Sequence, residues 1–535
     1  MSSLPAPIYR HAAPSGPWPW VDFDTDFLST TSEISIIHDG GSTVWSGYPQ
    51  THFGNWTSIP VERSKMLTQC AQKGPCVVYG IDVMDNGQFK IPHEQGLDRF
   101  EVSQEKEEEF WSKLNDKVEN VRVRALFVDN LTAPVLKMLG TRYNIEPFFF
   151  SSSTNWIPSR YQEEVQHGKG DHITVTLPFI RTMGKEKHIT PPCSPLGRKS
   201  TIDVLAPLHL HGEHVLLIDL LAIHMIRATY SSTIITYHPS LPGRTTAKRL
   251  HQVMARAGRS VYWNKIFEAS GDPTFFFLAI LWYALYAWDE AFEVLYLRIK
   301  HLEGILNDSD LAHTADLNHK LHSLQAHLLH YQTLLHDFEK SVAFVRDTPN
   351  PAIKSSDDRN TTNQLMQREC KNLLSEINRL QRKCLMFINR LKNATELAFA
   401  TVNIEDTQAS LRDSAAMKQI SYLTMVFLPA SFTASIFGMN VAEINPGSLE
   451  TVARYVEVTL LLTFVTTWVV IAFQPYSSIH KSGDGVWQRA AWPVFFFRRK
   501  FARYYRQNSS RENNPSWRPS RRRDQSSTMR FEDAV

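Results

Sequence analysis

The sequence predicts an α+β cytosolic domain followed by a long helical stalk and two transmembrane helices. Residues 21–265 alternate between short β-rich runs and helical patterns. Residues 362–440 contain no helix breaker before Pro429 and end in an uncharged stretch of about twenty residues. A second apolar stretch follows at residues 456–473, so two C-terminal segments are long enough to cross a hydrocarbon core.

The composition limits the class of protein and of partner. The 535 residues carry a formal net charge of +3, which is close to neutral and predicts no nucleic-acid partner. The length is enough for one large soluble domain beside membrane segments, or for two soluble domains. The cysteines are few, odd in number and scattered, which favours a reducing compartment without disulfides; they are Cys70, Cys76, Cys193, Cys370 and Cys384.

The first half of the chain divides into a proline-rich start and the α/β domain. Residues 1–20 contain five prolines and are expected to be disordered, with no features of a secretory signal or a mitochondrial presequence. Within residues 21–265, helices are expected over residues 101–118 and from Pro134 toward Tyr143. Strands are expected at residues 34–37, 77–81, 124–128, 173–177, 215–218 and 233–237.

This domain lacks the common catalytic motifs. The sequence holds no phosphate-binding GxxxxGK, no HExxH and no GxSxG, so we do not expect an enzyme. His209 and His211 would share one face of a strand near His214 and could meet a metal, although a surface loop explains them more simply. The same alternatives, chelation or a solvated helix face, apply to a second group: His319, His322, His327 and His330.

Residues 266–346 are predicted to form a cytosolic helical hairpin. Residues 274–288 are strongly apolar, but about fifteen residues are too few to span a membrane. Asp272 and Pro273 are typical of a helix N-cap and first turn, so we interpret this segment as a buried core helix. A second helix is expected over about residues 310–345, and residues 347–361 form a loop.

A heptad pattern marks the stalk, residues 362–440. Apolar side chains recur at alternating steps of four and three, which predicts partner helices along this seam: Met366, Cys370, Leu373, Ile377, Leu380, Cys384, Phe387 and Leu391. A continuous helix of this length is roughly 120 Å long at 1.5 Å per residue. The seam and the first membrane segment then lie on one rod, through which a cytosolic rearrangement could move the membrane end.

The uncharged end of this helix is not apolar on all sides. At helical spacing one face becomes small and hydroxylated toward its C-terminal end, whereas phenylalanines enlarge the other faces. Such a face could pack closely against another helix, or it could line a wet pore with hydroxyls. The face consists of Met417, Ile420, Thr424, Leu428, Ser431, Ser435 and Gly438.

The residues that close this helix carry a family resemblance. Gly438-Met439-Asn440 ends an uncharged helix with a mid-span Pro429, after a long polar helix and before a second and last apolar segment. In this arrangement residues 362–473 resemble the CorA family of divalent-cation transporters, and the N-terminal half resembles it in layout only. The resemblance implies a CorA-like fold, a homopentamer, and a long stalk helix continuous with the first span.

The same resemblance implies roles for individual residues. Gly438, Met439 and Asn440 would form the selectivity filter at the outer mouth, where the Asn440 ring meets the hydrated ion. The inward pore positions would be Ser435, Ser431, Leu428, Thr424, Ile420 and Met417. No cofactor is implied, and the transported ion would be Mg²⁺. The MPEL-type sequence that often follows the motif is absent here, with Glu443 and Pro446 as loose substitutes, so the choice of ion is open.

The remaining segments indicate the topology. Residues 441–455 form a short extracytosolic loop in which Glu443 and Glu450 could attract cations. Residues 456–473 are the second span and are expected to face lipid. Residues 474–535 hold thirteen Lys and Arg against five Asp and Glu, which places this basic tail, and with two spans the N-terminus, in the cytosol. The plasma membrane is expected first and an internal membrane second.

Three functions remain open on the sequence. The leading one is a passive divalent-cation channel, most of all for Mg²⁺, with the lipid bilayer and further copies of the chain as partners. The second is transport of zinc or another divalent metal, as in the ZntB branch of the same family. The third is a non-conducting membrane scaffold whose cytosolic domain binds a partner.

Overall fold

The computed structural model describes residues 13–16, 20, 43–70, 74–90, 99–116, 119–184, 202–210, 214–308, 314–437, 447, 451–473 and 491. The filter motif at residues 438–440, the loop acids Glu443 and Glu450, and almost all of residues 1–20 and 474–535 lie outside them. The chain divides into two compact units, Met1–Val402 and Asn403–Val535, and each is described by itself.

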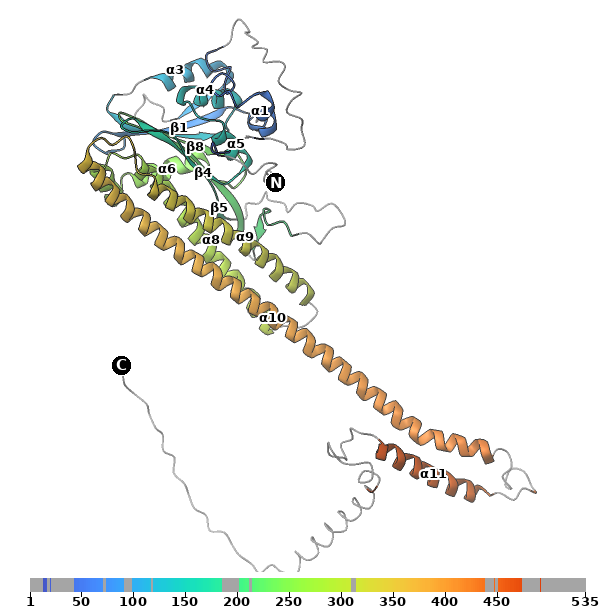
Figure 1. The fold of residues 1–535 in the computed structure, drawn as a ribbon. Helices are drawn as coiled ribbons and strands as arrows, with labels where there is room; N and C mark the ends of the chain where they lie inside the picture. The colour runs from blue at the N-terminus through green and yellow to red at the C-terminus, as the bar shows by residue number, and fades with distance from the viewer. Residues whose placement is uncertain are drawn as a thin grey trace, which may run out of the picture. The chain divides into compact units, whose positions relative to one another are not determined.

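One eight-stranded sheet organises the first unit (Figure 1). Its strand order is β2-β1-β3-β8-β7-β5-β4, with β6 also paired to β7. β3 and β8 are parallel and the other pairs are antiparallel. The strands are β1 Cys76–Met84, β2 Phe100–Val102, β3 Val121–Asp129, β4 Ser159–Gln166, β5 Gly170–Gly184, β6 Leu208–His209, β7 His214–Ala228 and β8 Ser232–His238.

The central strands are apolar on both faces because helices cover both faces. Every residue of β7 from Val215 to Met225 is buried, so this strand is a continuous apolar run without alternation. Helix α5 (Phe148–Asn155) covers the face of β5 that carries Thr176, whose hydroxyl lies 3.0 Å from that of Ser152. Helix α8 (Thr274–Asp308) covers the opposite face, where the rings of Phe179 and Tyr283 lie 6.3 Å apart.

The two helices expected in the first half of the chain are present, with a shift at the start of one of them. The helix expected from Glu101 begins at Glu107, because Glu101 belongs to β2 and a 3₁₀ turn intervenes. The helix around Pro134 is present, with Pro134 in its first turn. The remaining helices are α1 Ser58–Ser64, α2 Met66–Gln69, α3 Glu107–Asn115, α4 Ala133–Tyr143, α6 Ala247–Ala257, α7 Val261–Ala269, α9 Thr314–Asp347, α10 Ser356–Phe437 and α11 Val452–Phe473.

Helix α8 is a core helix of the first unit. Its length and composition would also allow a membrane span, but 67% of its apolar window is buried inside the structure. Phe275, Phe276 and Phe277 are each fully buried. The main chain of Thr274 donates a 2.9 Å hydrogen bond to Asp272 Oδ1, so the expected start of this helix is correct. Three described helices therefore meet the length and composition of a span, and the first unit buries one of them.

A buried ion pair joins α8 to the sheet. Arg227 on β7 and Asp171 on β5 are both completely buried, and Arg227 Nε donates to Asp171 Oδ1 at 2.6 Å. Arg227 also donates to the Thr348 carbonyl at 2.9 Å and to the Thr274 hydroxyl at 3.4 Å. Because each charge has its partner, the pair can be buried, and Arg227 links the start of α8 and the α9–α10 connection to the sheet.

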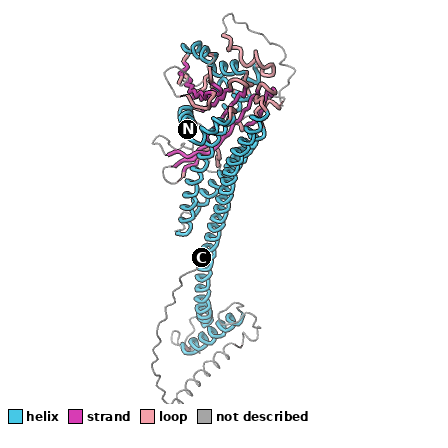
Figure 2. Tube along the Cα trace, turned by 90° about the vertical axis from the view of Figure 1, so that its left-hand side faces the viewer, coloured by secondary structure: helices cyan, strands magenta, loops and turns pink. Residues whose placement is uncertain are grey.

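The heptad seam of α10 is satisfied within the same chain. All eight seam residues are buried, with Phe387 packing its ring edge-on to Phe292 of α8 at 5.5 Å. The Cys384 thiol lies 3.7 Å from the Leu328 carbonyl of α9. Figure 1 shows α8, α9 and this part of α10 running side by side, and Figure 2 shows helices bundled below the sheet from a second direction. The partner helices of the seam are thus α8 and α9, so the seam gives no argument for contacts between copies.

The long helix begins earlier than the sequence predicted. Its first residue is Ser356 rather than Thr362, so residues 356–361 are helical and do not belong to the expected loop. The Ser355 hydroxyl accepts from the Asp358 main chain at 3.4 Å, and Asp357 and Asp358 lie in the first turn. A hydroxyl cap and early acidic residues both stabilise a helix N-terminus, which explains the longer helix.

Candidate pore-lining surface

The second unit presents the hydroxylated face of α10 as an exposed surface. Met417, Ile420 and Leu428 have exposed fractions of 73%, 63% and 67%. The hydroxyl residues of the same face are also exposed; they are Thr424, Ser431 and Ser435. The described helix ends at Phe437, so Gly438, which the sequence places on this face, and the rest of the motif lie just beyond it.

Helix α11 packs against the opposite face of α10. Thr433 is buried, and its hydroxyl lies 2.8 Å from the hydroxyl of Thr459 on α11. The rings of Phe437 and Tyr455 meet edge-on at 6.0 Å. At 100° per residue, positions 433 and 437 lie across the helix from positions 428, 431 and 435. The candidate pore-lining surface is therefore turned away from α11 within the chain, and packing on the second span does not account for it.

The hydroxyls on the exposed face donate their protons to their own helix. Ser431 Oγ donates to the Phe427 carbonyl and Ser435 Oγ donates to the Ser431 carbonyl, each at 2.9 Å. Thr424 Oγ1 donates to the Ser421 carbonyl at 2.9 Å. Each oxygen therefore directs its lone pairs outward as an uncharged acceptor. Water molecules around a cation donate outward, so such acceptors match the hydrated form of the ion.

A row of threonines on α11 was missed at the sequence level. Thr459, Thr463 and Thr467 follow one another at steps of four, and each hydroxyl donates to the carbonyl one turn earlier at 2.7 Å. Thr463 and Thr467 are partly buried, like Thr466, on the side of α11 that carries Thr459. The repeated spacing was the available signal, since small hydroxyl residues let two helices approach closely.

The other faces of the two C-terminal helices carry exposed apolar side chains. On α10, Phe427 and Phe432 are 61% and 56% exposed, and on α11 Leu460 and Phe464 are 66% and 64% exposed. The apolar windows of these two helices are 12% and 0% buried inside the structure. Apolar surface of this extent is stable against lipid or against further protein.

The two histidine groups chosen from the sequence do not form metal sites among the described residues. His209 lies on β6 opposite Val215, His214 begins β7, and His211 is outside the described residues. On α9, His327 is buried against Tyr331, and burial lowers its pKa to about 4. The ligand-type side chains that do converge in the described part are Glu163, His172 and His224, from three different strands.

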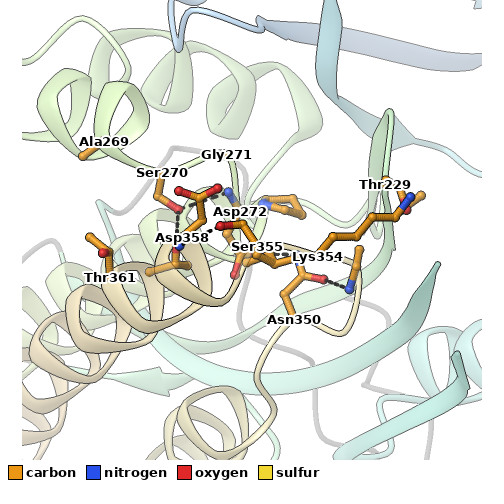
Figure 3. A pocket seen from close by; sticks show the side chains of 15 residues that line it. Thr229, Ala269, Ser270, Gly271, Asp272, Asn350, Lys354, Ser355, Asp358 and Thr361 are labelled. Atoms are coloured by element: carbon orange, nitrogen blue, oxygen red, sulfur yellow. Dashed lines mark hydrogen bonds between the residues drawn. The ribbon is translucent and has the colours of Figure 1, made fainter. Parts of the chain in front are cut away.

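A polar pocket lies at the start of α10, and its buried carboxylate, Asp272, has a structural role (Figure 3). The pocket has a volume of about 530 Å³ and lies where the α9–α10 connection meets the junction of α7 and α8, with Ser355 and Asp358 on its α10 side. Asp272 Oδ1 accepts from the Thr274 main chain at 2.9 Å and from Asn350 Nδ2 at 3.2 Å. Asp272 thus caps α8 and anchors the connection before α10.

The described cysteines are inert thiols. Cys70, Cys370 and Cys384 are buried, and burial raises the pKa of each to about 12. Burial also raises the pKa of the Cys76 thiol. Because the thiolate is the reactive form, these side chains behave as small apolar groups. Cys193 lies outside the described residues.

The described chain consists of an α/β unit, a long helix and apolar C-terminal helices. Residues 234–474 match the family model described as "CorA-like Mg2+ transporter protein", so this stretch of the chain is CorA-like in sequence. It runs from β8 to the end of α11.

Solved structures with similarity to this chain include two of one protein. The CorA magnesium transporter from Methanocaldococcus jannaschii is 12% identical, covers 73% of this chain and 96% of its own, and has a TM-score of 0.43. Its soluble domain is 11% identical over 61% of this chain and 96% of its own, with a TM-score of 0.36. The full-length CmaX protein is 10% identical over 74% of this chain and 100% of its own, with a TM-score of 0.37. The comparison with curated proteins gave no match.

Proposed function

We propose that this protein is a membrane transporter for divalent cations, most of all Mg²⁺, and that copies of α10 surround a shared aqueous pore. The observation that carries the proposal is the orientation of α10: its hydroxylated face is exposed, and α11 covers the opposite face. The family match over residues 234–474 supports the same function. A homopentamer is the assembly we propose, in line with the CorA resemblance.

An uncharged lining suits a strongly hydrated ion. Mg²⁺ releases its water reluctantly, so a pore that accepts hydrogen bonds from the water shell selects the ion without removing the shell. Ser431 and Ser435 offer such acceptors on the described helix. Asn440, three residues beyond its end, would add a ring of amide oxygens at the outer mouth, with Gly438 and Met439 beside it. Glu443 and Glu450 in the following loop would raise the local cation concentration.

The cytosolic end of the same face supplies the gate in this proposal. Met417 and Ile420 are exposed apolar side chains on α10, about two turns and one turn before Thr424. Rings of apolar side chains close a narrow pore by expelling water from it. A small rotation of α10 would replace these side chains in the pore with the neighbouring polar ones and would open the path.

Ion flux into liposomes tests this function directly. Purified full-length protein is reconstituted, and uptake is compared for Mg²⁺, Co²⁺, Zn²⁺ and Ca²⁺ in the wild type, Asn440→Ala and the control Asn378→Ala. Asn378 lies in the first unit, on the stalk part of α10, and donates to the Leu374 carbonyl at 3.0 Å; it is not one of the proposed pore residues. We expect Mg²⁺ uptake in the wild type and the control and its loss in Asn440→Ala.

The other outcomes have defined meanings. Preference for Zn²⁺ over Mg²⁺ would assign the chain to zinc transport within the same fold. Equal uptake by the wild type and Asn440→Ala would contradict the proposed filter. No flux of any ion through intact wild-type oligomers would favour a membrane scaffold.

A further inference from the structure

Three side chains that can bind a metal converge on one face of the sheet, in the first unit. Glu163 on β4, His172 on β5 and His224 on β7 each offer a ligand atom, and these atoms all lie within 4.8 Å of one another. The two imidazole rings are 5.3 Å apart and nearly perpendicular, at 78°. No two of these residues are close enough in sequence to suggest the group.

The strand register explains why they meet. Glu163 is directly opposite His172 in the β4–β5 pair, and Thr174 is directly opposite His224 in the β5–β7 pair. His172 and Thr174 are two residues apart on β5 and share a face, so His172 and His224 are diagonal neighbours across two strands. A register shift after Glu163, with φ of +51° at Glu164, ends the regular pairing at this point.

Each of the three converging residues has one buried side-chain atom without a hydrogen-bond partner among the described residues. His224 is completely buried and His172 is 8% exposed. Glu163 Oε1, His172 Nδ1 and His224 Nε2 each lack a partner among the described residues. Buried polar atoms without partners are unfavourable, so three of them on converging residues favour a bound ligand at this place.

The second nitrogen of each imidazole has a neighbour that orients the ring. His224 Nδ1 lies 2.8 Å from the Thr174 hydroxyl; when this nitrogen carries the proton, Nε2 keeps its lone pair for a metal. His172 Nε2 lies 3.8 Å from Glu164 Oε2, which leaves Nδ1 toward the group. Metal-bound histidines typically use their outer nitrogen in this way, toward a hydroxyl or a carboxylate.

We propose that Glu163, His172 and His224 bind one divalent transition-metal ion of the zinc class. Two imidazole nitrogens and one carboxylate oxygen are a donor set that zinc and its neighbours prefer, whereas Mg²⁺ and Ca²⁺ prefer oxygen ligands alone. The site is thus distinct in chemistry from the oxygen-lined pore surface. Water, or the neighbouring Glu146 carboxyl, completes the coordination.

Local electrostatics agree with this assignment. Burial lowers the pKa of His172 and of His224, which keeps both imidazoles in the neutral form that binds metals. Burial and the adjacent charge of Glu146 raise the pKa of the Glu163 carboxyl. A bound cation would remove this unfavourable environment for the carboxylate, and the carboxyl would release its proton on binding.

The position of the site in the sheet indicates how an ion reaches it and what a bound ion would stabilise. β4 is the last strand of the sheet, and the Glu164 side chain at its edge is 44% exposed, so the group lies near solvent. Phe149 of α5 closes the site from above, with its ring 5.3 Å from His224. A bound ion would tie the edge strand to β5 and β7 and would stabilise the first unit.

Metal titration of the purified full-length protein tests the site. After treatment with a chelator, Zn²⁺ is titrated into the wild type, Glu163→Gln, His224→Gln and the control His238→Gln. His238 is a completely buried histidine on β8 that pairs with Thr236, so it matches His224 in burial without belonging to the group. X-ray absorption of the zinc-loaded protein reports the ligand atoms.

We expect one Zn²⁺ per chain in the wild type and in His238→Gln, with nitrogen ligands in the absorption spectrum and a higher melting temperature with zinc than without. Glu163→Gln and His224→Gln should lose this binding by at least about tenfold. Circular dichroism shows whether each variant is folded. If His224→Gln is unfolded, the test rests on Glu163→Gln, which keeps the shape of the side chain. Zinc binding unchanged in folded Glu163→Gln, or absorption showing oxygen ligands only, would overturn the proposal.

Discussion

Two phenylalanines on the same helix show how differently the two units of this chain are built. Phe387 in the stalk part of α10 is completely buried, and Phe427 forty residues later is 61% exposed. The first is surrounded by α8 and α9 of its own chain, as its contact with Phe292 shows. The second lies on the uncharged end of α10, of which one side packs against α11. The first unit closes its own core, whereas the second requires lipid or further copies.

The difference between the two units also indicates which surface is available for contacts between copies of the chain. A heptad seam in a stalk commonly indicates association of chains. Here the seam residues pack against α8 and α9 of the same chain. Another copy could contact them only if the first unit opened. The described surface left for assembly in the second unit includes the hydroxylated face of α10.

The largest expected effect compares the two phenylalanines directly. Phe387→Ala leaves a cavity in a closed core and should lower the free energy of unfolding by about 3–5 kcal/mol. Phe427→Ala changes an exposed side chain of the second unit and should change the stability of the first unit by less than about 0.5 kcal/mol. Urea unfolding in detergent, followed by tryptophan fluorescence, measures both. A Phe427→Ala variant as destabilised as Phe387→Ala would mean that Phe427 belongs to a core formed between copies.

A smaller effect is the loss of stability of the first unit at acidic pH. Burial lowers the pKa of His238 to about 3, below the value near 6.5 expected in the unfolded chain. Between these values only the unfolded state binds the proton, so stability falls as the pH falls below about 6.5. At pH 5 this group should reduce the free energy of unfolding by about 2 kcal/mol relative to neutral pH.

The matched variant isolates this contribution. His238→Gln should be less sensitive than the wild type to a change from pH 7 to pH 5, in chemical unfolding at each pH. Residues 403–473 contain no histidine, so the helical signal of the second unit should not follow this titration. An unchanged difference between the two pH values in His238→Gln would refute the assignment.

The smallest effect concerns the contact between the two C-terminal helices. Thr433→Val and Thr459→Val each remove one hydroxyl of the 2.8 Å pair, and their coupling energy should be about 0.6 kcal/mol, typical of hydrogen bonds between membrane helices. A double-mutant cycle on thermal stability in detergent measures it. Thr424→Val, on the exposed face of α10, serves as the control and should show no coupling to Thr459→Val.

The sequence predicted elements well where one periodicity dominates. The runs at residues 77–81, 124–128, 173–177, 215–218 and 233–237 all lie in strands, and the run at residues 34–37 is outside the described residues. β4 was missed because an edge strand with Glu163 and Glu164 is polar and lacks strict alternation. β5 and β7 are longer than expected, since burial on both faces removes the usual end signals.

The candidate sites differ in the same way. The sequence predicted that residues from Met417 to Ser435 share one face, because they lie on one helix and helical spacing determines the face of each residue. The contact between Thr433 and α11 could not be predicted from the sequence. A threonine whose hydroxyl hydrogen-bonds to its own helix can face either lipid or a partner helix, and the sequence is the same in both cases. The group around His224 depends on the register of three strands, which no local pattern reveals.

Cysteine accessibility in liposomes tests the central claim, that the hydroxylated face of α10 borders water shared between copies. Single cysteines are placed at Ser431 and Ser435 on this face, at Phe432 on the apolar face and at Thr433 against α11, in a background with Cys193 replaced and the buried thiols retained. A water-soluble thiol reagent should modify the cysteines at 431 and 435 and block Mg²⁺ flux, and leave those at 432 and 433 unmodified. Equal modification at all four positions, or modification at 432 and 433 alone, would contradict a pore on this face.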